Sequence, residues 1–177
     1  MLDYCVGKQV PVVLCTTGLS EEQLTKVKDA SEKVAVLKSA NMSLGINMLL
    51  KLLQDATKIL APAGYDIEIV EKHHNQKVDA PSGTALMLAE ICDPAHEKDW
   101  VCGRQGESRR GDELGIHSIR GGTIFGEHDV IFALKDEVIE IRHTAFSKRI
   151  FAKGAIEAAL WLNGKKKGMY SIEDVFY

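Results

Sequence analysis

The first part of the chain alternates short apolar runs with an amphipathic segment. Residues 10–15 and 34–40 are valine-rich runs of the length expected for buried strands. Residues 20–33, between them, predict a helix, because Ser20 and Gln23 have the spacing of a capping box and apolar positions recur on one face. A strand, a helix and a strand with short joints predict a parallel βαβ unit with a right-handed crossover.

The middle of the chain combines a long helix with a regularly alternating strand. Residues 44–60 are apolar nearly all round at their start and predict a helix that ends at an Ala-Pro-Ala-Gly stretch. Residues 65–74 alternate between two faces and predict a strand. One face of this strand carries Ile67, Ile69, Glu71 and His73. A helix is expected over residues 81–92, with Pro81 in its first turn, where proline is tolerated.

The last part of the chain predicts a second sheet and a closing helix. Residues 93–113 are polar and rich in glycine and arginine, which predicts a long loop. Three later runs predict strands over residues 114–121, 123–134 and 137–146. Residues 148–163 predict a helix that Gly164 ends. Its apolar positions are expected to be Ile150, Phe151, Ile156, Ala159 and Leu160. The expected fold class is therefore α/β, with a parallel piece followed by a mixed, mostly antiparallel sheet.

The composition is that of an ordinary globular chain and excludes several classes of protein. Its 177 residues suffice for one domain or two small ones, and 45% hydrophobic with 27% charged residues is a normal balance. A formal net charge of -3 gives no nucleic-acid signal. No apolar run approaches the roughly 20 residues of a membrane helix. None of the four cysteines forms a C-x-x-C pair, which predicts free thiols in a reducing cytoplasm: Cys5, Cys15, Cys92 and Cys102.

The stretch EKHHNQKVDAPSGTAL, residues 71–86, concentrates candidate chemistry. The first turn of the predicted helix would present the amides of Gly83 and Thr84, and Lys77 adds a positive charge nearby. A helix N-terminus of this kind binds carboxylate or phosphate. The alternative is an ordinary helix start beside a surface lysine.

Two adjacent histidines precede this helix. Neighbouring residues of a strand point to opposite faces, so His73 and His74 are expected to have different roles. Histidine titrates near neutral pH, which suits a proton donor. The alternatives are one hydrogen-bonded and one exposed histidine, or a metal site. The metal site is disfavoured because no third ligand stands at motif spacing, and no metal ligand is predicted.

Two loops follow the first two predicted strands. Residues 15–18 read Cys-Thr-Thr-Gly and residues 39–43 read Ser-Ala-Asn-Met-Ser. Ligands of open α/β sheets bind beyond the carboxyl ends of the strands, so both loops could line one crevice. Ordinary turns between strands and helices are the alternative.

The order of these segments resembles the dihydrodipicolinate reductase family. The family motif E-x-H-H-x-x-K-x-D-A-P-S-G-T-A is matched by residues 71–85 without a gap. Further matching segments span most of the chain: Thr-Thr-Gly at 16–18, NMSLGIN at 41–47, GEHDVIFA at 126–133 and IRHTAFSKRIFAKGAIEAALWL at 141–162. The resemblance implies an oxidoreductase that reduces 4-hydroxy-tetrahydrodipicolinate to tetrahydrodipicolinate with NADH or NADPH, in lysine and diaminopimelate biosynthesis.

The resemblance also assigns roles to individual residues. His73 matches the general acid, and Lys77 matches a second proton donor that also contacts a substrate carboxylate. The remaining substrate-binding matches are His74, Gly83, Thr84 and Lys148. The cofactor-binding matches, at the nicotinamide end, are Cys15, Thr16, Thr17, Ala40, Asn41, Met42 and Ser43.

The resemblance further implies a division of the chain and an assembly. Residues 1–44 and 149–177 match part of a Rossmann-type dinucleotide-binding domain, the C-terminal remnant of its parallel sheet. Residues 45–148 match an α+β domain for substrate binding and oligomerisation. The implied assembly is a cytoplasmic homotetramer, and neither nucleic acid nor membrane is expected as a partner.

Three features depart from the family pattern. Cys15 replaces a glycine and is expected to crowd the nicotinamide loop. Lys148 replaces a frequent arginine, keeping the charge but losing the bidentate fork. The family's glycine-rich turn G-x-x-G-x-x-G is not found in this sequence, and residues 1–7 match a helix well inside the nucleotide-binding domain. We therefore expect two or three βα units to be missing, by fragmentation or natural truncation.

The missing turn leaves competing functional hypotheses. The first is the reductase itself. The second is a catalytically weak module for substrate binding or assembly, which the missing turn favours and the retained His73 and Lys77 oppose. A hydrolase that uses His73 with Ser82 or a cysteine is disfavoured, because no nucleophile-elbow pattern is present. This chain alone is expected to bind NADH or NADPH no better than about millimolar, since a few loop hydrogen bonds do not offset the cost of association.

Overall fold

The computed structural model describes residues 1–176 and divides the chain into two compact units. The first unit comprises Met1–Asn47 and the chain from Arg149 onward, and the second comprises Met48–Lys148. The chain passes from the first unit to the second within helix α3, Leu44–Leu60, whose bounds are those predicted. None of the helices in the described part of the chain is long and apolar enough to cross a membrane.

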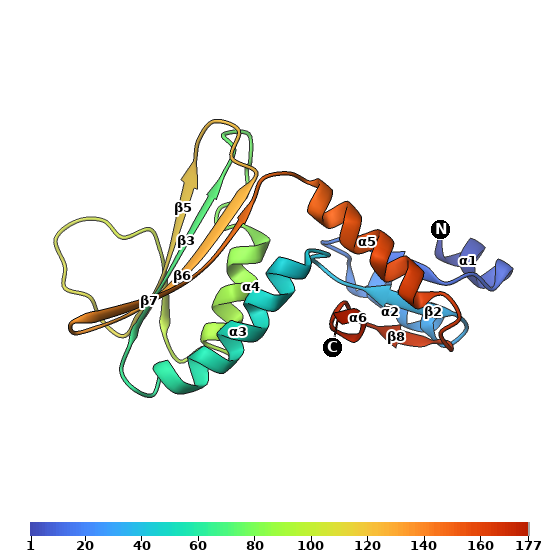
Figure 1. The fold of residues 1–177 in the computed structure, drawn as a ribbon, viewed down its shortest axis with the longest axis horizontal. Helices are drawn as coiled ribbons and strands as arrows, with labels where there is room; N and C mark the ends of the chain where they lie inside the picture. Colours follow the sequence, from blue (N-terminus) through green and yellow to red (C-terminus); the bar gives the residue numbers. More distant parts are fainter. Residues whose placement is uncertain (177) are drawn as a thin grey trace. The chain divides into compact units, whose positions relative to one another are not determined.

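The first unit is built on a parallel sheet of three strands in the order β1-β2-β8 (Figure 1). The strands are β1 Val12–Leu14, β2 Ala35–Lys38 and β8 Gly168–Tyr170. The helices of this unit are α1 Leu2–Lys8, α2 Glu21–Ser31, α5 Arg149–Leu162 and α6 Glu173–Phe176. The predicted parallel βαβ unit is confirmed, and Ser20 and Gln23 form the predicted capping box at the start of α2.

Both faces of this sheet are covered because apolar residues alternate along β2. Val36 belongs to a cluster on one face with residues of α1, β1, α2 and the segment before β2: Cys5, Val12, Leu14, Val27, Ala30 and Val34. Leu37 belongs to a cluster on the other face with residues of β2, the loop after it, α5 and the C-terminal segment: Ala35, Met42, Ala158, Leu162 and Ile172. Strand β8 and helix α6, which follow the three consecutive lysines, were not predicted from the sequence.

Helix α5 forms as predicted but buries a different face. None of the five predicted apolar positions is buried, and Ile156 and Leu160 are 62% and 73% exposed. The buried residues are Gly154, Ala158 and Leu162, spaced four apart. The small residues allow the helix backbone to approach its neighbours closely, so the larger apolar side chains face away.

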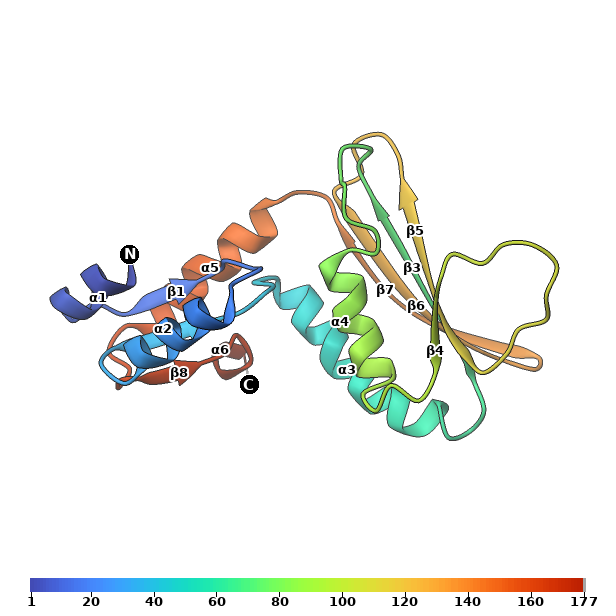
Figure 2. The same ribbon diagram turned by 180° about the vertical axis from the view of Figure 1, so that it is seen from behind.

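The second unit is a sheet of five strands in the order β4-β5-β3-β6-β7, with α3 and α4 on one face (Figure 2). The elements are β3 Asp66–His73, α4 Gly83–Cys92, β4 Asp99–Cys102, β5 Glu113–Arg120, β6 Gly126–Leu134 and β7 Glu137–Ala145. The most deeply buried side chains of the sheet's helix-covered face and of the two helices include Leu53, Ile67, Ile69, Leu88, Leu114, Ile116, Val130 and Phe132. The predicted alternation along β3 is confirmed.

The sheet is mixed, as predicted, with two parallel and two antiparallel strand pairings. Two details of this unit differ from prediction. The predicted loop over residues 93–113 contains β4, because this short segment pairs in parallel with β5. Helix α4 begins at Gly83 rather than Pro81, because the Ser82 side chain caps it and leaves Pro81 outside.

Candidate active site

Glu71 is a fully buried carboxylate at the centre of the second unit's polar cluster. The Arg120 guanidinium donates two hydrogen bonds to it, from Nη2 to Oε1 at 2.7 Å and from Nη1 to Oε2 at 2.9 Å. Burial by itself would raise the pKa of Glu71, but hydrogen bonds from Arg120, Ser118 and His73 lower it to about 2. Glu71 is therefore ionised throughout the neutral range, and it can only accept hydrogen bonds.

His73 lies next to this carboxylate at the end of β3. Its Nδ1 is 2.5 Å from Glu71 Oε2, and an ionised carboxylate requires the proton to sit on Nδ1. The other ring nitrogen, Nε2, therefore remains to bind or deliver a proton. A Cβ on Gly126 would lie 3.2 Å from Nε2, so the glycine leaves room beside this atom. Burial lowers the pKa of His73, and the Glu71 carboxylate opposes that effect.

Ser82 begins helix α4 beside the same carboxylate. Its Oγ accepts the amide of Ala85 at 3.2 Å, and its own amide donates to Glu71 Oε1 at 3.2 Å. Gly83 and Thr84 consequently supply the first amides of the helix. No atom lies within 4 Å of a Cβ built on Gly83, so a ligand can approach the backbone there. This arrangement suits a carboxylate at the helix N-terminus.

Lys77 lies in the loop between β3 and α4. Its Nζ is 2.8 and 2.9 Å from the two carboxylate oxygens of Asp79, and its amide donates to the carbonyl of His74. Arg120 Nη2 also donates to the Asp79 carbonyl at 2.6 Å, which ties this loop to the Glu71 cluster. The structure therefore connects His73, Lys77 and the start of α4 through hydrogen bonds.

The two other predicted substrate residues are placed differently. His74 directly follows His73, and its side chain is half-buried. Lys148 follows β7 with an exposed side chain, and no interaction in residues 1–176 links it to the His73 cluster. The predicted role of Lys148 therefore has no geometric support within the second unit.

The predicted cofactor loops meet at one edge of the first unit's sheet. Leu14 and Lys38 are neighbours in register at the carboxyl ends of β1 and β2, and the Ser39 amide donates to the Leu14 carbonyl. The loop after β1 is exposed at Cys15, Thr16 and Thr17. These hydroxyl and main-chain groups are neutral donors and acceptors, which fit an uncharged carboxamide.

The second loop is held by its own side chains. Ala40 is exposed, but Asn41, Met42 and Ser43 are buried. Asn41 Oδ1 accepts the Ser43 amide at 2.9 Å, and Asn47 Nδ2 donates to the Ser43 carbonyl at 2.7 Å. A ligand at this loop would therefore meet backbone and Ala40 rather than the buried side chains.

Several site residues could not be singled out from the sequence. Arg120 reaches Glu71 from β5, which is far away in the chain, and nothing in its local pattern marks it. His128 on β6 is buried, with Nε2 3.2 Å from Ser82 Oγ, and burial lowers its pKa to about 4. Glu71 did carry a signal, since a carboxylate shares the apolar face of β3 with Ile67 and Ile69.

The two units together define a class of protein. A parallel α/β unit with open loops at one sheet edge accompanies a unit that gathers an imidazole, an ammonium and a helix N-terminus. This organisation is typical of an enzyme that acts on a small anionic substrate. The chain belongs to the dihydrodipicolinate reductase family, since the family's C-terminal region matches residues 45–176 and its N-terminal region matches residues 1–42.

Individual relatives agree with this assignment. A Clostridium tetani protein named 4-hydroxy-tetrahydrodipicolinate reductase is 52% identical over 176 residues, covering 98% of this chain and 69% of the relative. A protein of the same name from Caldanaerobacter subterraneus subsp. tengcongensis is 53% identical over 172 residues, covering 95% of this chain and 68% of the relative. A solved dipicolinate-bound dihydrodipicolinate reductase from Paenisporosarcina sp. TG-14 is 25% identical with a TM-score of 0.76, covering 98% of this chain and 67% of that one. The resemblance read from residues 71–85 is confirmed.

Proposed function

We propose that the chain acts in the NAD(P)H-dependent reduction of 4-hydroxy-tetrahydrodipicolinate to tetrahydrodipicolinate, a step of lysine and diaminopimelate biosynthesis. The observation that carries this proposal is the arrangement around Glu71. One carboxylate holds the proton-donor His73 and the N-terminus of α4, and the Arg120 bound to it also holds the Lys77 loop. Family membership supplies the reaction.

Different residues of the second unit bind the carboxylates of a dicarboxylate substrate and deliver protons to it. The amides of Gly83 and Thr84 bind one carboxylate at the helix N-terminus. Lys77 has its ammonium held by Asp79 and exchanges that partner for a substrate carboxylate. His73, with Nδ1–H on Glu71, delivers a proton from Nε2 to the reduced substrate. Lys77 is the second group able to give a proton.

The cofactor residues belong to the first unit. The exposed Cys15, Thr16 and Thr17, with the backbone around Ala40, would hold the nicotinamide end. When bound, the nicotinamide would supply the hydride; with a proton from the protein, the reaction balances when the substrate's 4-hydroxyl group leaves as water.

The experiment combines binding with turnover. Calorimetry with pyridine-2,6-dicarboxylate should show binding to the 177-residue chain, and His73→Ala should retain most of that affinity. Because the chain is expected to bind NADH or NADPH only weakly, turnover is measured at millimolar cofactor. Cofactor oxidation should depend on 4-hydroxy-tetrahydrodipicolinate and fall about 10²–10⁴-fold in His73→Ala. Dicarboxylate binding without turnover would favour the alternative, a substrate-binding or assembly module. Absence of dicarboxylate binding would contradict both.

We further propose a cytoplasmic homotetramer. The four cysteines are all free, as suits a reducing compartment. Helices α3 and α4 cover one face of the second unit's sheet, while the opposite face carries exposed apolar residues such as Val138 at 57%. A second copy of the chain would cover that face.

A further inference from the structure

The proposed function uses His73, Lys77 and the start of α4 but leaves the Glu71–Arg120 pair without a role. We propose that Glu71 and Arg120 are positioning residues of the proposed reductase, which set the proton-donating nitrogen of His73 and the geometry of the carboxylate cradle together. The inference rests on the proposed function for its catalytic meaning. Its geometry is independent of that function.

Glu71 determines which nitrogen of His73 carries the proton. Glu71 Oε2 lies 2.5 Å from His73 Nδ1, so the carboxylate fixes the Nδ1–H tautomer and leaves Nε2 as the exchanging site. Nε2 points to the space beside Gly126, where a Cβ would come within 3.2 Å. An isolated imidazole would distribute its proton between both nitrogens and lose this directionality.

Glu71 and Arg120 also hold the backbone around the carboxylate cradle. Glu71 Oε1 accepts the amide of Ser82, the N-cap of α4, at 3.2 Å. Arg120 Nη2 donates at once to that same oxygen at 2.7 Å and to the Asp79 carbonyl at 2.6 Å. The ion pair therefore bridges the helix N-terminus to the loop that carries Lys77. A shift of either residue would move both carboxylate contacts of the proposed substrate.

A purely structural role explains the pair less well. A fully buried carboxylate is costly to desolvate, and buried ion pairs often add less stability than apolar residues of similar volume. The pair lies directly against a proposed acid and a proposed anion cradle, and a role in positioning these two groups accounts for keeping a buried charge there. Glu71 is buried at 0% exposure, whereas the comparable His96–Glu90 pair has side chains more than half exposed.

The charged and titratable groups that face His73 come from several elements. Glu71 lies on β3, Arg120 on β5, Lys77 in the loop after β3, and His128 on β6, with its ring 5.1 Å from that of His73. Burial lowers the pKa of His73, and Lys77 and Arg120 lower it further. Glu71 is the group that favours the protonated ring, so its charge keeps the acid form accessible.

Nitrogen NMR of the His73 ring in the 177-residue chain tests, without any ligand, whether Glu71 sets the tautomer of His73. Glu71→Gln should shift the His73 titration midpoint downward and move neutral ring population from Nδ1–H toward Nε2–H, because an amide is neutral and a weaker acceptor. Glu90→Gln is the matched control, since it removes a carboxylate from the exposed His96 and should leave the His73 signals unchanged. A His73 midpoint and tautomer in Glu71→Gln equal to those of the control would overturn the inference.

Arg120→Lys tests whether the ion pair holds the carboxylate cradle. It also keeps the proposal testable if the Glu71 variant fails to fold. Lysine keeps the charge but cannot bridge Glu71 and the Asp79 carbonyl as a planar fork does. The variant should keep the Nδ1–H tautomer of His73 and lose about ten-fold or more in affinity for pyridine-2,6-dicarboxylate. Unchanged affinity would overturn the cradle role. Failure of the wild-type chain to bind this probe would instead contradict the proposed function, while the NMR result would still decide the tautomer.

Discussion

Gly154 on α5 packs directly against the main-chain carbonyl of Met42: a Cβ at this position would lie 1.8 Å from the carbonyl oxygen. Both residues belong to the first unit, and Met42 lies in the second proposed cofactor loop. The missing side chain of Gly154 thus lets α5 rest on the loop. Backbone cannot move aside as a flexible side chain would, so the contact constrains the sequence of α5.

Gly154→Ala should therefore destabilise the protein by about 1–3 kcal/mol, the usual cost of overpacking. Denaturant unfolding measures the effect. Gly7→Ala in α1 is the control, because nothing lies within 4 Å of its Cβ position and alanine favours helix by about 0.5–1 kcal/mol. Equal stability of the two variants would show that the Met42 contact relaxes without cost.

The sequence predicted the local parts of the fold well. Period-two alternation placed Glu71 and His73 on the buried face of β3, and the capping box at Ser20 located the start of α2. The histidine motif pointed to the site because its residues are close in the chain. Such features depend on neighbours within a few residues, which the sequence displays directly.

The rest depended on contacts that sequence patterns do not encode. Arg120 meets Glu71 only because β3 and β5 pair in parallel, with His73 opposite Arg120. Likewise, β4 forms only because it pairs in parallel with β5, although its segment is polar enough to be predicted as a loop. The buried face of α5 was mispredicted because close backbone packing at Gly154 outweighed the burial of larger apolar residues.

Lys77→Ala should weaken binding of pyridine-2,6-dicarboxylate. A charge-assisted hydrogen bond is worth about 1.5–3 kcal/mol, so the expected loss is about ten- to hundred-fold in affinity. The Lys77 side chain is 22% exposed, which limits screening by solvent. Lys58→Ala, which removes an exposed lysine paired with Asp55 on α3, should leave the affinity unchanged. Calorimetry at constant ionic strength separates the two; equal losses would indicate a long-range charge effect only.

Stability should fall as the solution is acidified below neutral pH. Burial lowers the pKa of His128 from 6.5 to about 4. Between these values the unfolded chain binds more protons than the folded one, so the free energy of unfolding decreases as pH drops from 6.5 toward 4. The full loss from His128 is on the order of 3 kcal/mol. His128→Gln should flatten this slope in denaturation series, whereas His96→Gln, at an exposed histidine, should not. A wild-type slope retained in His128→Gln would assign the effect to other groups.

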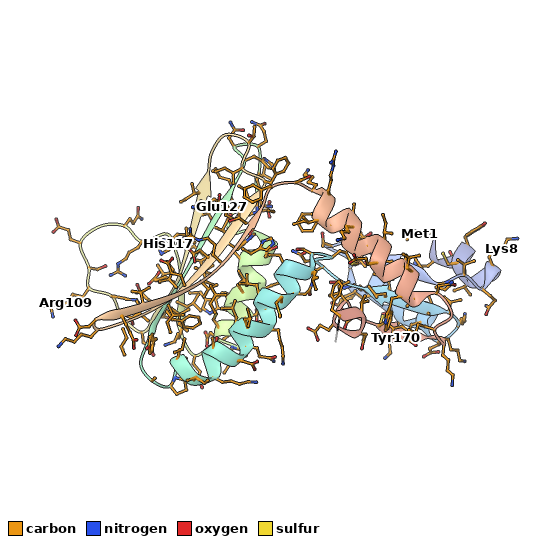
Figure 3. The ribbon with its side chains drawn as sticks, in the orientation of Figure 1. Met1, Lys8, Arg109, His117, Glu127 and Tyr170 are labelled. Carbon is orange, nitrogen blue, oxygen red and sulfur yellow. The ribbon has the colours of Figure 1, made fainter. Side chains whose placement is uncertain are left out.

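The uncovered face of the second unit's sheet should mediate assembly. Sheet register places Val138 beside Ala133, and this face also carries charged and titratable residues such as His117 and Glu127 (Figure 3). Val138 is 57% exposed in the single chain, and other apolar residues of the sheet are exposed by smaller fractions. We expect light scattering at micromolar concentration to give four times the chain mass for the wild type, and a smaller species for Val138→Asp, because a carboxylate buried without a partner opposes association.

Ile59→Asp is the control: Ile59 is 70% exposed on α3, away from this face, and its variant should keep the wild-type mass. A stable wild-type monomer would contradict the proposed tetramer, and dissociation by Ile59→Asp but not by Val138→Asp would move the interface from the sheet to α3.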